Sequence, residues 1–514
     1  MLCLDVVQII CDFSDLRTQI NLIQLCKEYD EYLKIKKLNC SVRIGYNITQ
    51  EIIQQKKFNK LQKLNANYNR KITDVNHLQN TLTELDCWND SGIDQKGISN
   101  LKVLQKLNAT NNSKIRDLTH LRNTLTKLNC DGAVCGIDQK GFSDLKVLQI
   151  LYARDNNKIT DVNHLQNTLT ELDCQCNCGI DQKGIFALKV LQKLNAGNNK
   201  KMTDINHLQN TLIGLDCYGN CGIDQKGISN LKVLQKLNAQ HNDKITDVNH
   251  LQNTLTELNC CLDCGIDQKG IFNLKVLQKL DARNNSKITD LTHLQNALIE
   301  LDCCGSNCGI NQKGISNLKI LRKLAANNNN KITDVNHLRN TLTELYCCDS
   351  CGIDQKGISE LKVLQKLNAF SNSKITDVNN LRTTLIELDC SYYCGIDQKG
   401  ISNLKVLQIL DACRNSNITN VNHLQNTLTE LDCYGDCGID QKGISKLKVL
   451  QKLHAGSNSK ITNVNHLRRT LTELNCCDAC GIDQKGIFKL KVLQKLNAYN
   501  NSKITDVKVC LLKK

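Results

Sequence analysis

One pattern recurs along almost the whole of this chain and restricts what the chain can fold into. The pattern is LxxLxAxxNxxI, and its first complete copy consists of Leu61, Leu64, Ala66, Asn69 and Ile72. Between successive copies lies a sister segment, LxxLxC, as at Leu82, Leu85 and Cys87, which is followed by CGIDQKG or a near variant. The unit is therefore a pair of half-repeats of about 21 and 22 residues. Units of this size cannot each close a core of their own, so we predict that they stack side by side.

The first glycine of the CGIDQKG string measures the period. It recurs at steps of 43 or 44 residues: Gly92, Gly136, Gly179, Gly222, Gly265, Gly309, Gly352, Gly395, Gly438 and Gly481. The two steps of 44 each add one residue, near Val134 and Ser306. This spacing is typical of leucine-rich repeats. We therefore predict an α/β repeat fold, a leucine-rich-repeat solenoid (horseshoe or arc) with a parallel sheet on its concave face and short helical turns on its convex face. A small α-helical head, residues 1–34, would precede a solenoid of about 22 half-repeats over residues 35–514.

Within a half-repeat, both leucines and the sixth residue are expected to point inward from a short strand. An asparagine follows three residues after each alanine, where the chain must turn and leave backbone groups unpaired. We predict that these asparagines form a structural ladder rather than a binding site: Asn69, Asn112, Asn156, Asn199, Asn242, Asn285, Asn329, Asn372, Asn415, Asn458 and Asn501. Thr73, Asp74 and Asp94 are suited to start the helical turns that follow.

Of the 30 cysteines, 19 form two columns, ten at the sixth template position and nine before the glycine. Same-type strands lie about 9.6 Å apart, whereas a disulfide needs Cα atoms within about 7 Å. We therefore expect buried free thiols. The CxxxC spacing does not match the usual zinc motifs, so no metal site is predicted.

Histidines also recur at one position, as at His77, and Asn380 interrupts their column. They are too far apart to share a metal, and we expect them to be solvated on the convex face. The sequence has no GxxxxGK, HExxH or GxSxG motif. We therefore predict a protein that is not an enzyme, with no catalytic residues and no cofactor.

Charge is distributed regularly. The third template position is mostly lysine in one half-repeat and mostly glutamate in the other, so neighbouring strands should pair opposite charges. The formal net charge of +15 is then expected to come from convex-face lysines such as Lys96, Lys102 and Lys114, a pattern that usually serves solubility, so a nucleic-acid partner is not favoured. The sequence contains no long uncharged apolar run and does not open with a basic leader, so we expect no membrane association and a cytoplasmic monomer.

The repeats differ from one another mainly at the two residues after the sixth position. Large side chains stand there, of the types enriched at binding hot spots. This row is the candidate partner-binding surface, with neutral drift as the alternative: Trp88, Arg154, Tyr218, Arg283, Phe370, Tyr392, Arg414, Tyr434 and Tyr499.

The first 34 residues contain three apolar sets, and Leu4-Asp5-Val6-Val7 and Leu25-Cys26-Lys27-Glu28-Tyr29 stand where an F-box has Leu-Pro-x-x-hydrophobic and Val-Cys-aromatic segments. Asp5 replaces the usual proline. The strings KITDV and GIDQKGI resemble the cysteine-containing leucine-rich repeats of F-box proteins, and the Asn-, Ile- and Lys-rich duplication resembles F-box proteins of giant DNA viruses. The resemblance implies a substrate receptor of a cullin ubiquitin ligase in the cytoplasm (of the host cell, if viral). Its solenoid would select a protein substrate, and its head would bind a Skp-type adaptor through Leu4, Val7, Ile10 and Phe13.

Two other interpretations stay open. The head helices could instead cap the exposed first repeat, which every solenoid requires. The protein would then be a free-standing leucine-rich-repeat scaffold without a role in ubiquitin transfer. A third and less favoured class is a solenoid that binds RNA through its convex lysines.

Overall fold

The structure is a computed structural model that describes residues 4–13, 16–25, 29, 32–40 and 48–506. It divides into two compact units, residues 1–246 and 247–514. The boundary predicted between head and repeats, after residue 34, falls within the first unit. None of the helices in the described ranges is long and apolar enough to cross a membrane.

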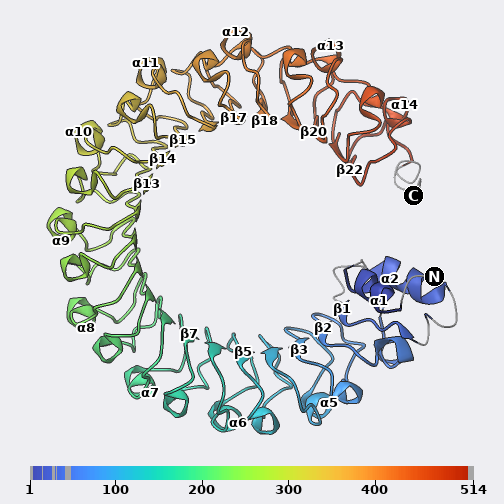
Figure 1. Cartoon of the computed structure of the whole chain (residues 1–514), viewed down its shortest axis with the longest axis vertical. Coiled ribbons are helices and arrows are strands. Elements are labelled where there is room, and N and C mark those ends of the chain that lie inside the picture. Colours follow the sequence, from blue (N-terminus) through green and yellow to red (C-terminus); the bar gives the residue numbers. More distant parts are fainter. Residues whose placement is uncertain (1–3, 14–15, 26–28, 30–31, 41–47, 507–514) are drawn as a thin grey trace. The chain divides into compact units, whose positions relative to one another are not determined.

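The first unit opens with two helices and continues with strands that alternate with short helical turns (Figure 1). Its strands are β1 (Lys37–Asn39), β2 (Lys63–Asn65), β3 (Glu84–Asp86), β4 (Lys106–Asn108), β5 (Lys127–Asn129), β6 (Ile150–Tyr152), β7 (Glu171–Asp173), β8 (Lys193–Asn195), β9 (Gly214–Asp216) and β10 (Lys236–Asn238). Its α-helices are α1 (Leu4–Phe13), α2 (Leu16–Gln24), α4 (Gln50–Ile53), α5 (Gln95–Ile98), α6 (Gln139–Phe142), α7 (Gln182–Ile185) and α8 (Gln225–Ile228). Its 3₁₀ turns are η2 (Lys56–Phe58), η3 (Asn76–Leu78), η4 (Thr119–Leu121), η5 (Asn163–Leu165) and η6 (Asn206–Leu208).

The second unit repeats the same order without a head. Its strands are β11 (Glu257–Asn259), β12 (Lys279–Asp281), β13 (Glu300–Asp302), β14 (Lys323–Ala325), β15 (Glu344–Tyr346), β16 (Lys366–Asn368), β17 (Glu387–Asp389), β18 (Ile409–Asp411), β19 (Glu430–Asp432), β20 (Lys452–His454), β21 (Glu473–Asn475) and β22 (Lys495–Asn497). Its α-helices are α9 (Gln268–Ile271), α10 (Gln312–Ile315), α11 (Gln355–Ile358), α12 (Gln398–Ile401), α13 (Gln441–Ile444) and α14 (Gln484–Ile487). Its 3₁₀ turns are η7 (Asn249–Leu251), η8 (Thr292–Leu294), η9 (Asn336–Leu338), η10 (Asn379–Leu381), η11 (Asn422–Leu424) and η12 (Asn465–Leu467).

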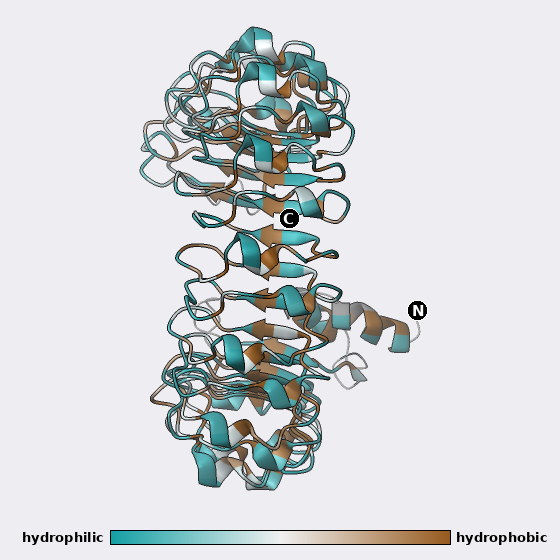
Figure 2. Cartoon of the chain, turned by 90° about the vertical axis from the view of Figure 1, so that its left-hand side faces the viewer, coloured by the Kyte–Doolittle hydropathy of each residue, from teal (hydrophilic) through white to brown (hydrophobic). Residues whose placement is uncertain are grey.

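Within each unit, consecutive strands pair in parallel and in register, so that equivalent template positions face one another. Between β2 and β3, for example, Leu64 is opposite Leu85 and Lys63 is opposite Glu84. The central leucine of each strand from β1 to β21 is buried in the core, whereas its two neighbours stay partly or fully exposed on the sheet face. Figure 2 shows apolar segments recurring from strand to strand, with hydrophilic segments on the loops. The parallel sheet and short helical turns predicted from the repeat are confirmed.

Two glycines of the CGIDQKG string allow neighbouring half-repeats to approach closely. A Cβ atom on Gly97 would lie 2.0 Å from the carbonyl oxygen of Thr73, and one on Gly92 would lie 2.4 Å from that of Ile72. No side chain fits at those distances. The Gly97 carbonyl also accepts a hydrogen bond from the Val75 amide at 2.9 Å. These glycines therefore set the stacking distance between half-repeats.

In one half-repeat the helical turn begins at the predicted residue, whereas in the other it begins after the predicted Thr73 and Asp74. Asp94 caps α5 by accepting a hydrogen bond from the Gly97 amide at 3.0 Å, and equivalent residues cap α6 to α14. In the other half-repeat the turn starts at Asn76 and is a 3₁₀ turn, with Asp74 accepting from the Asn76 amide at 2.7 Å.

The asparagine ladder is confirmed. Asn199 is buried, and its amide donates to the carbonyl oxygens of Cys174 at 2.8 Å and Ile180 at 3.1 Å. Its side-chain oxygen accepts from the Lys201 amide at 3.0 Å. The same three contacts recur at the other buried asparagines, from Asn112 to Asn501. One side chain in each double repeat thus satisfies backbone groups of its own turn and of the preceding half-repeat.

Candidate functional site

The variable row begins where each strand ends and the backbone turns. The second residue after the buried alanine or cysteine has a positive φ in every half-repeat from Tyr68 to Asn500. Most of these residues are Asn, Asp, Ser or Gly, which tolerate this conformation. Tyr392 and Arg414 adopt it with φ of 60° and 52°, although large side chains rarely do. Local backbone preference therefore does not explain why these two residues stand there.

Four predicted row residues of the second unit lie together. The ring centroids of Phe370 and Tyr392 are 4.9 Å apart, and the Arg414 guanidinium lies over the Tyr392 ring at 5.4 Å. The Arg414 amide donates to the Tyr434 carbonyl at 3.0 Å. We call Phe370, Tyr392, Arg414 and Tyr434 the aromatic–arginine cluster. Tyr392, Arg414 and Tyr434 line a cavity of 480 Å³ together with Tyr393, Gly435, Asp436 and Ser457.

The other predicted row residues do not join this cluster. Trp88 packs edge-on against Tyr68, with ring centroids 4.8 Å apart. Arg154 forms an ion pair with Asp155 at 3.7 Å, and the Tyr218 hydroxyl donates to the side-chain oxygen of Gln175. Arg283 forms ion pairs with Asp281 at 2.7 Å and Asp302 at 3.5 Å. The exposed Tyr499 lies beyond β22.

The sheet face carries the alternating charges predicted from the third template position. Glu84 accepts ion pairs from both Lys63 at 2.7 Å and Lys106 at 2.8 Å. Partial burial opposes ionisation of Glu84, but the hydrogen bonds from the two lysines outweigh it and hold the pKa below its usual value. Equivalent pairs recur in the second unit, as between Lys366 and Glu387 at 2.6 Å. Each of these partly exposed ion pairs contributes little stability. Together they leave the third template position of the sheet face nearly neutral.

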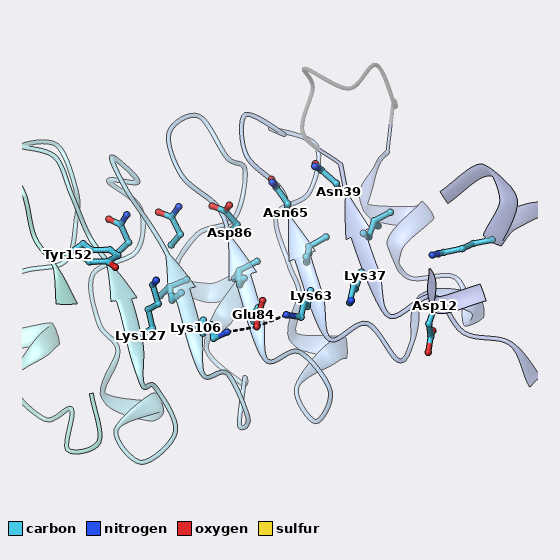
Figure 3. A pocket seen from close by; sticks show the side chains of 17 residues that line it. Asp12, Lys37, Asn39, Lys63, Asn65, Glu84, Asp86, Lys106, Lys127 and Tyr152 are labelled. Carbon is cyan, nitrogen blue, oxygen red and sulfur yellow. Dashed lines mark hydrogen bonds and ion pairs between the residues drawn. The ribbon is translucent and has the colours of Figure 1, made fainter. Parts of the chain in front are cut away.

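A groove of 690 Å³ on the sheet face of the first unit breaks this balance (Figure 3). Its floor is formed by β1 to β6, and Asp12 and Gln19 of the head line one end. Glutamate gives way to Lys127 in β5, and the Lys127 ammonium lies 4.8 Å from the centre of the Tyr152 ring. Figure 3 shows Glu84 between Lys63 and Lys106. The groove was not predicted from the sequence, although Lys127 and Tyr152 depart from the template at two sheet-face positions.

A second region of the sheet face, in the second unit, carries an excess of acidic side chains. Aspartate occupies the fifth template position in three successive strands, as Asp389, Asp411 and Asp432, and His454 follows in β20. His454 Nδ1 lies 2.6 Å from a carboxylate oxygen of Asp432. Burial, with the neighbouring carboxylates Asp389 and Asp432, raises the pKa of Asp411 to about 6. A cavity of 530 Å³ covers Asp411, Asp432 and His454.

The repeated cysteines behave as expected. The ten thiols at the sixth template position are fully buried, and none of these ten forms a disulfide: Cys87, Cys130, Cys174, Cys217, Cys260, Cys303, Cys347, Cys390, Cys433 and Cys476. Burial raises the pKa of Cys130 and Cys174 well above the ordinary value. They act as small apolar side chains rather than as nucleophiles.

The histidine column is only partly solvated, which differs from the expectation. His207 and His466 each place Nε2 3.1 Å from the carbonyl oxygen of the last residue of a neighbouring helical turn, Ile185 and Ile444 respectively. Burial lowers the pKa of both imidazoles. These rings therefore pair with helix ends, as the carbonyls there require a donor.

The residues of the head that were predicted to bind the adaptor differ from one another in exposure. Val7 is 3% exposed and belongs to the core, whereas Leu4 is partly exposed. The side chains of Ile10 and Phe13 lie outside the described residues. Among the side chains of α1 that the structure describes, Val6 is 41% exposed and Ile9 is 56% exposed.

Polar contacts tie the head to the first repeat. Gln8 donates to the Lys34 carbonyl at 3.0 Å and accepts from the Lys34 amide at 2.9 Å. Asp12 pairs with Lys36 at 2.6 Å. These contacts anchor α1 next to β1.

The repeat, the register and the buried ladders together define a leucine-rich-repeat solenoid. No model of a protein family matches the sequence, and no curated protein matches it. Solved structures with a similar fold include the TLR13–ssRNA13 complex, at 18% identity over 93% of this chain and 70% of that chain, with a TM-score of 0.49. Leptospira interrogans LRR protein LIC12759 is 22% identical over 86% of this chain and 95% of its own, with a TM-score of 0.37.

A third similar structure is the LRR ectodomain of the Arabidopsis thaliana membrane receptor kinase GASSHO1/SCHENGEN3 in complex with CASPARIAN STRIP INTEGRITY FACTOR 2. It is 13% identical over 99% of this chain and 74% of that chain, with a TM-score of 0.36. At these identities the likeness is one of fold alone.

Proposed function

We propose that this chain is a non-enzymatic recognition protein that binds a partner protein at the aromatic–arginine cluster. The observation that carries the proposal is that the Phe370–Tyr392 ring contact and the Arg414–Tyr392 contact form a continuous surface beside a cavity. Neutral drift at exposed positions would not be expected to place stacking partners on successive strands. Tyrosine and arginine are enriched at hot spots of protein interfaces.

The cluster is also prepared for binding before a partner arrives. Stacking restricts the Arg414 and Tyr392 side chains, which lowers the entropy that binding would otherwise cost. Tyr393 is 84% exposed next to them and lines the same cavity. A partner could therefore bury a large tyrosine ring at little conformational cost.

Capture from a eukaryotic lysate with the tagged full-length chain tests this proposal. We expect the Tyr392→Ala/Arg414→Glu variant to lose a protein that the wild type retains. Lys405→Glu is the matched control, because it makes the same charge change at an exposed lysine outside the strand-end row. Identical captured proteins for the double variant and the wild type would exclude the cluster as the binding surface.

We further propose that the head recruits the Skp-type adaptor of a cullin ubiquitin ligase, which would make the chain a substrate receptor. This finer function rests on the F-box resemblance of residues 1–34 and on the exposed Val6 and Ile9 of α1. With Val7 buried, the adaptor-binding surface would consist of Leu4, Val6 and Ile9. The alternative is a free-standing scaffold whose head only caps β1 through the Gln8 and Asp12 contacts.

The two readings of the head differ in one measurable outcome. If the head recruits the adaptor, the full chain should capture adaptor and cullin, and Val6→Asp/Ile9→Asp should lose both. Val134→Asp/Phe186→Asp provides the control, because it places the same two negative charges at exposed apolar residues of the repeats. Capture of neither protein by the wild type, or equal capture by all three chains, would leave the scaffold function.

A further inference from the structure

One side-chain cluster on the sheet of the second unit combines two carboxylates and a thiol. Asp411 at the end of β18, Cys413 two residues later and Asp432 at the end of β19 each offer one ligand atom, and these three atoms lie within 4.8 Å of one another. All three residues are partly buried. Asp411 and Asp432 also line the 530 Å³ cavity on the sheet face.

The hydrogen bonds around the cluster fix its orientation. The Cys413 amide donates to Asp411 at 2.9 Å, and the Tyr434 amide donates to Asp432 at 2.9 Å. His454 Nδ1 contacts the other Asp432 oxygen at 2.6 Å. Backbone amides thus orient both carboxylates, which line the cavity, and Cys413 lies two residues beyond the end of β18.

A pair of aspartates on adjacent strands occurs in the second unit at an equivalent position of the repeat, but there an arginine stands in place of the cysteine. Asp281 and Asp302 occupy the equivalent fifth positions of β12 and β13, and Arg283 stands at the position equivalent to Cys413. Its guanidinium pairs with Asp281 at 2.7 Å and with Asp302 at 3.5 Å. The repeat therefore places a cation between paired aspartates there, whereas a thiol takes the cation's place between Asp411 and Asp432.

We propose that Asp411, Cys413 and Asp432 form a binding site for a divalent transition-metal ion of the zinc class. Carboxylate oxygens alone would suit calcium or magnesium, but a thiolate ligand selects zinc-like ions. Ligand atoms of a tetrahedral zinc site lie about 3.5 Å apart. Side-chain rotations that move each ligand atom by about 1 Å would therefore bring the three atoms to this spacing. This site departs from the sequence-based prediction that the chain has no metal site.

The proposed coordination also assigns roles to the neighbours. Three protein ligands leave a fourth position for water or for a donor from a bound partner. His454 acts as a positioning residue, because it orients Asp432 through the hydrogen bond at 2.6 Å. On binding, the ion replaces the proton of the Cys413 thiol, which passes to solvent.

Titration of the full-length chain with Co²⁺ tests the proposal, because a thiolate bound to Co²⁺ gives a charge-transfer absorption band that carboxylates do not. We expect one such site per chain, and we expect Zn²⁺ to displace Co²⁺ from it. Asp432→Asn should weaken binding by at least about tenfold. Cys413→Arg should abolish the band and still fold, since Arg283 already occupies the equivalent position between two aspartates.

Because the chain has 30 cysteines, the control must be another thiol beside a carboxylate. Cys304 is partly buried next to Asp302, where Arg283 already supplies a positive charge. Cys304→Ser should therefore bind Co²⁺ like the wild type. Absence of the band in the wild type, its persistence in Cys413→Arg, or its loss in Cys304→Ser would each overturn the proposal.

Discussion

Removal of one rung of the asparagine ladder should destabilise the solenoid strongly. The Asn199 side chain is the hydrogen-bond partner of three backbone groups: the carbonyls of Cys174 and Ile180 and the amide of Lys201. A buried polar group left without a partner costs about 1–3 kcal/mol, so three would cost about 3–9 kcal/mol. A water molecule entering the space left by Asn199→Ala would recover part of this, and we expect a loss of about 3–5 kcal/mol.

Urea unfolding followed by circular dichroism measures the loss, and hydrogen exchange shows where it occurs. Because half-repeats contact mainly their neighbours, faster exchange should be confined to the half-repeats around Asn199. Asn199→Asp separates hydrogen bonding from volume, since it is nearly isosteric but turns an oxygen toward two carbonyls; it should be at least as destabilising at pH 7. Asn220→Ala, at an exposed position, should stay within about 0.5 kcal/mol of the wild type. An Asn199→Asp chain as stable as the wild type would refute the reasoning.

Three further predictions use other features of the frame. Gly357→Ala should lower the unfolding temperature, because its Cβ would lie 2.1 Å from the Thr333 carbonyl oxygen, whereas Gly214→Ala should be tolerated, because the nearest atom there is 3.8 Å away; equal unfolding temperatures would contradict this. The column histidines have a pKa lowered by burial, so the stability they contribute is present above about pH 6.5 and is lost as the pH falls. A chain with His→Asn at seven of them should lose less unfolding free energy between pH 7 and pH 5 than the wild type does, as measured by urea titration, because asparagine has no charge to gain. Asparagine fits this position, since Asn380 already donates to the Ile358 carbonyl there. An equal loss in the variant and the wild type would contradict this prediction. The seven are His120, His164, His207, His293, His337, His423 and His466. Alkylation with peptide mapping should leave the sixth-position thiols, such as Cys130, unmodified until denaturant is added, because they are buried; labelling in the native chain would show that the core is open.

The frame of the fold could be predicted from the sequence because each of its parts is repeated. Leu64, Ala66 and Asn69 recur with one spacing, and that spacing alone fixes which residues face the core and which backbone groups need a partner. The in-register strands, the buried thiols and the asparagine contacts follow from it. The histidine contacts were missed because a helix end supplies their partner, and nothing in the column itself shows where that end lies.

The candidate sites could be predicted only in part, because they depend on which irregular residues meet across strands. The row that includes Tyr392 and Arg414 was predicted because the repeats differ in sequence at these positions. The sequence did not show that these two side chains stack on each other, nor that Trp88 and Arg283 contact other residues. The cluster around Cys413 was missed for a similar reason: Asp432 is ordinary at the fifth position of its half-repeat, and although Asp411 stands where most sister strands have asparagine, the sequence alone did not show that the two carboxylates and the thiol meet.

Hydrogen exchange of the full chain with and without a captured partner protein tests the central claim most directly, namely that the regular frame is structural and its irregular residues bind. The account predicts that protection on binding is concentrated at the strand ends from Phe370 to Asp436, and that it disappears in Tyr392→Ala/Arg414→Glu. Protection confined to the lysine-bearing helical turns, or spread evenly over all repeats, would contradict it.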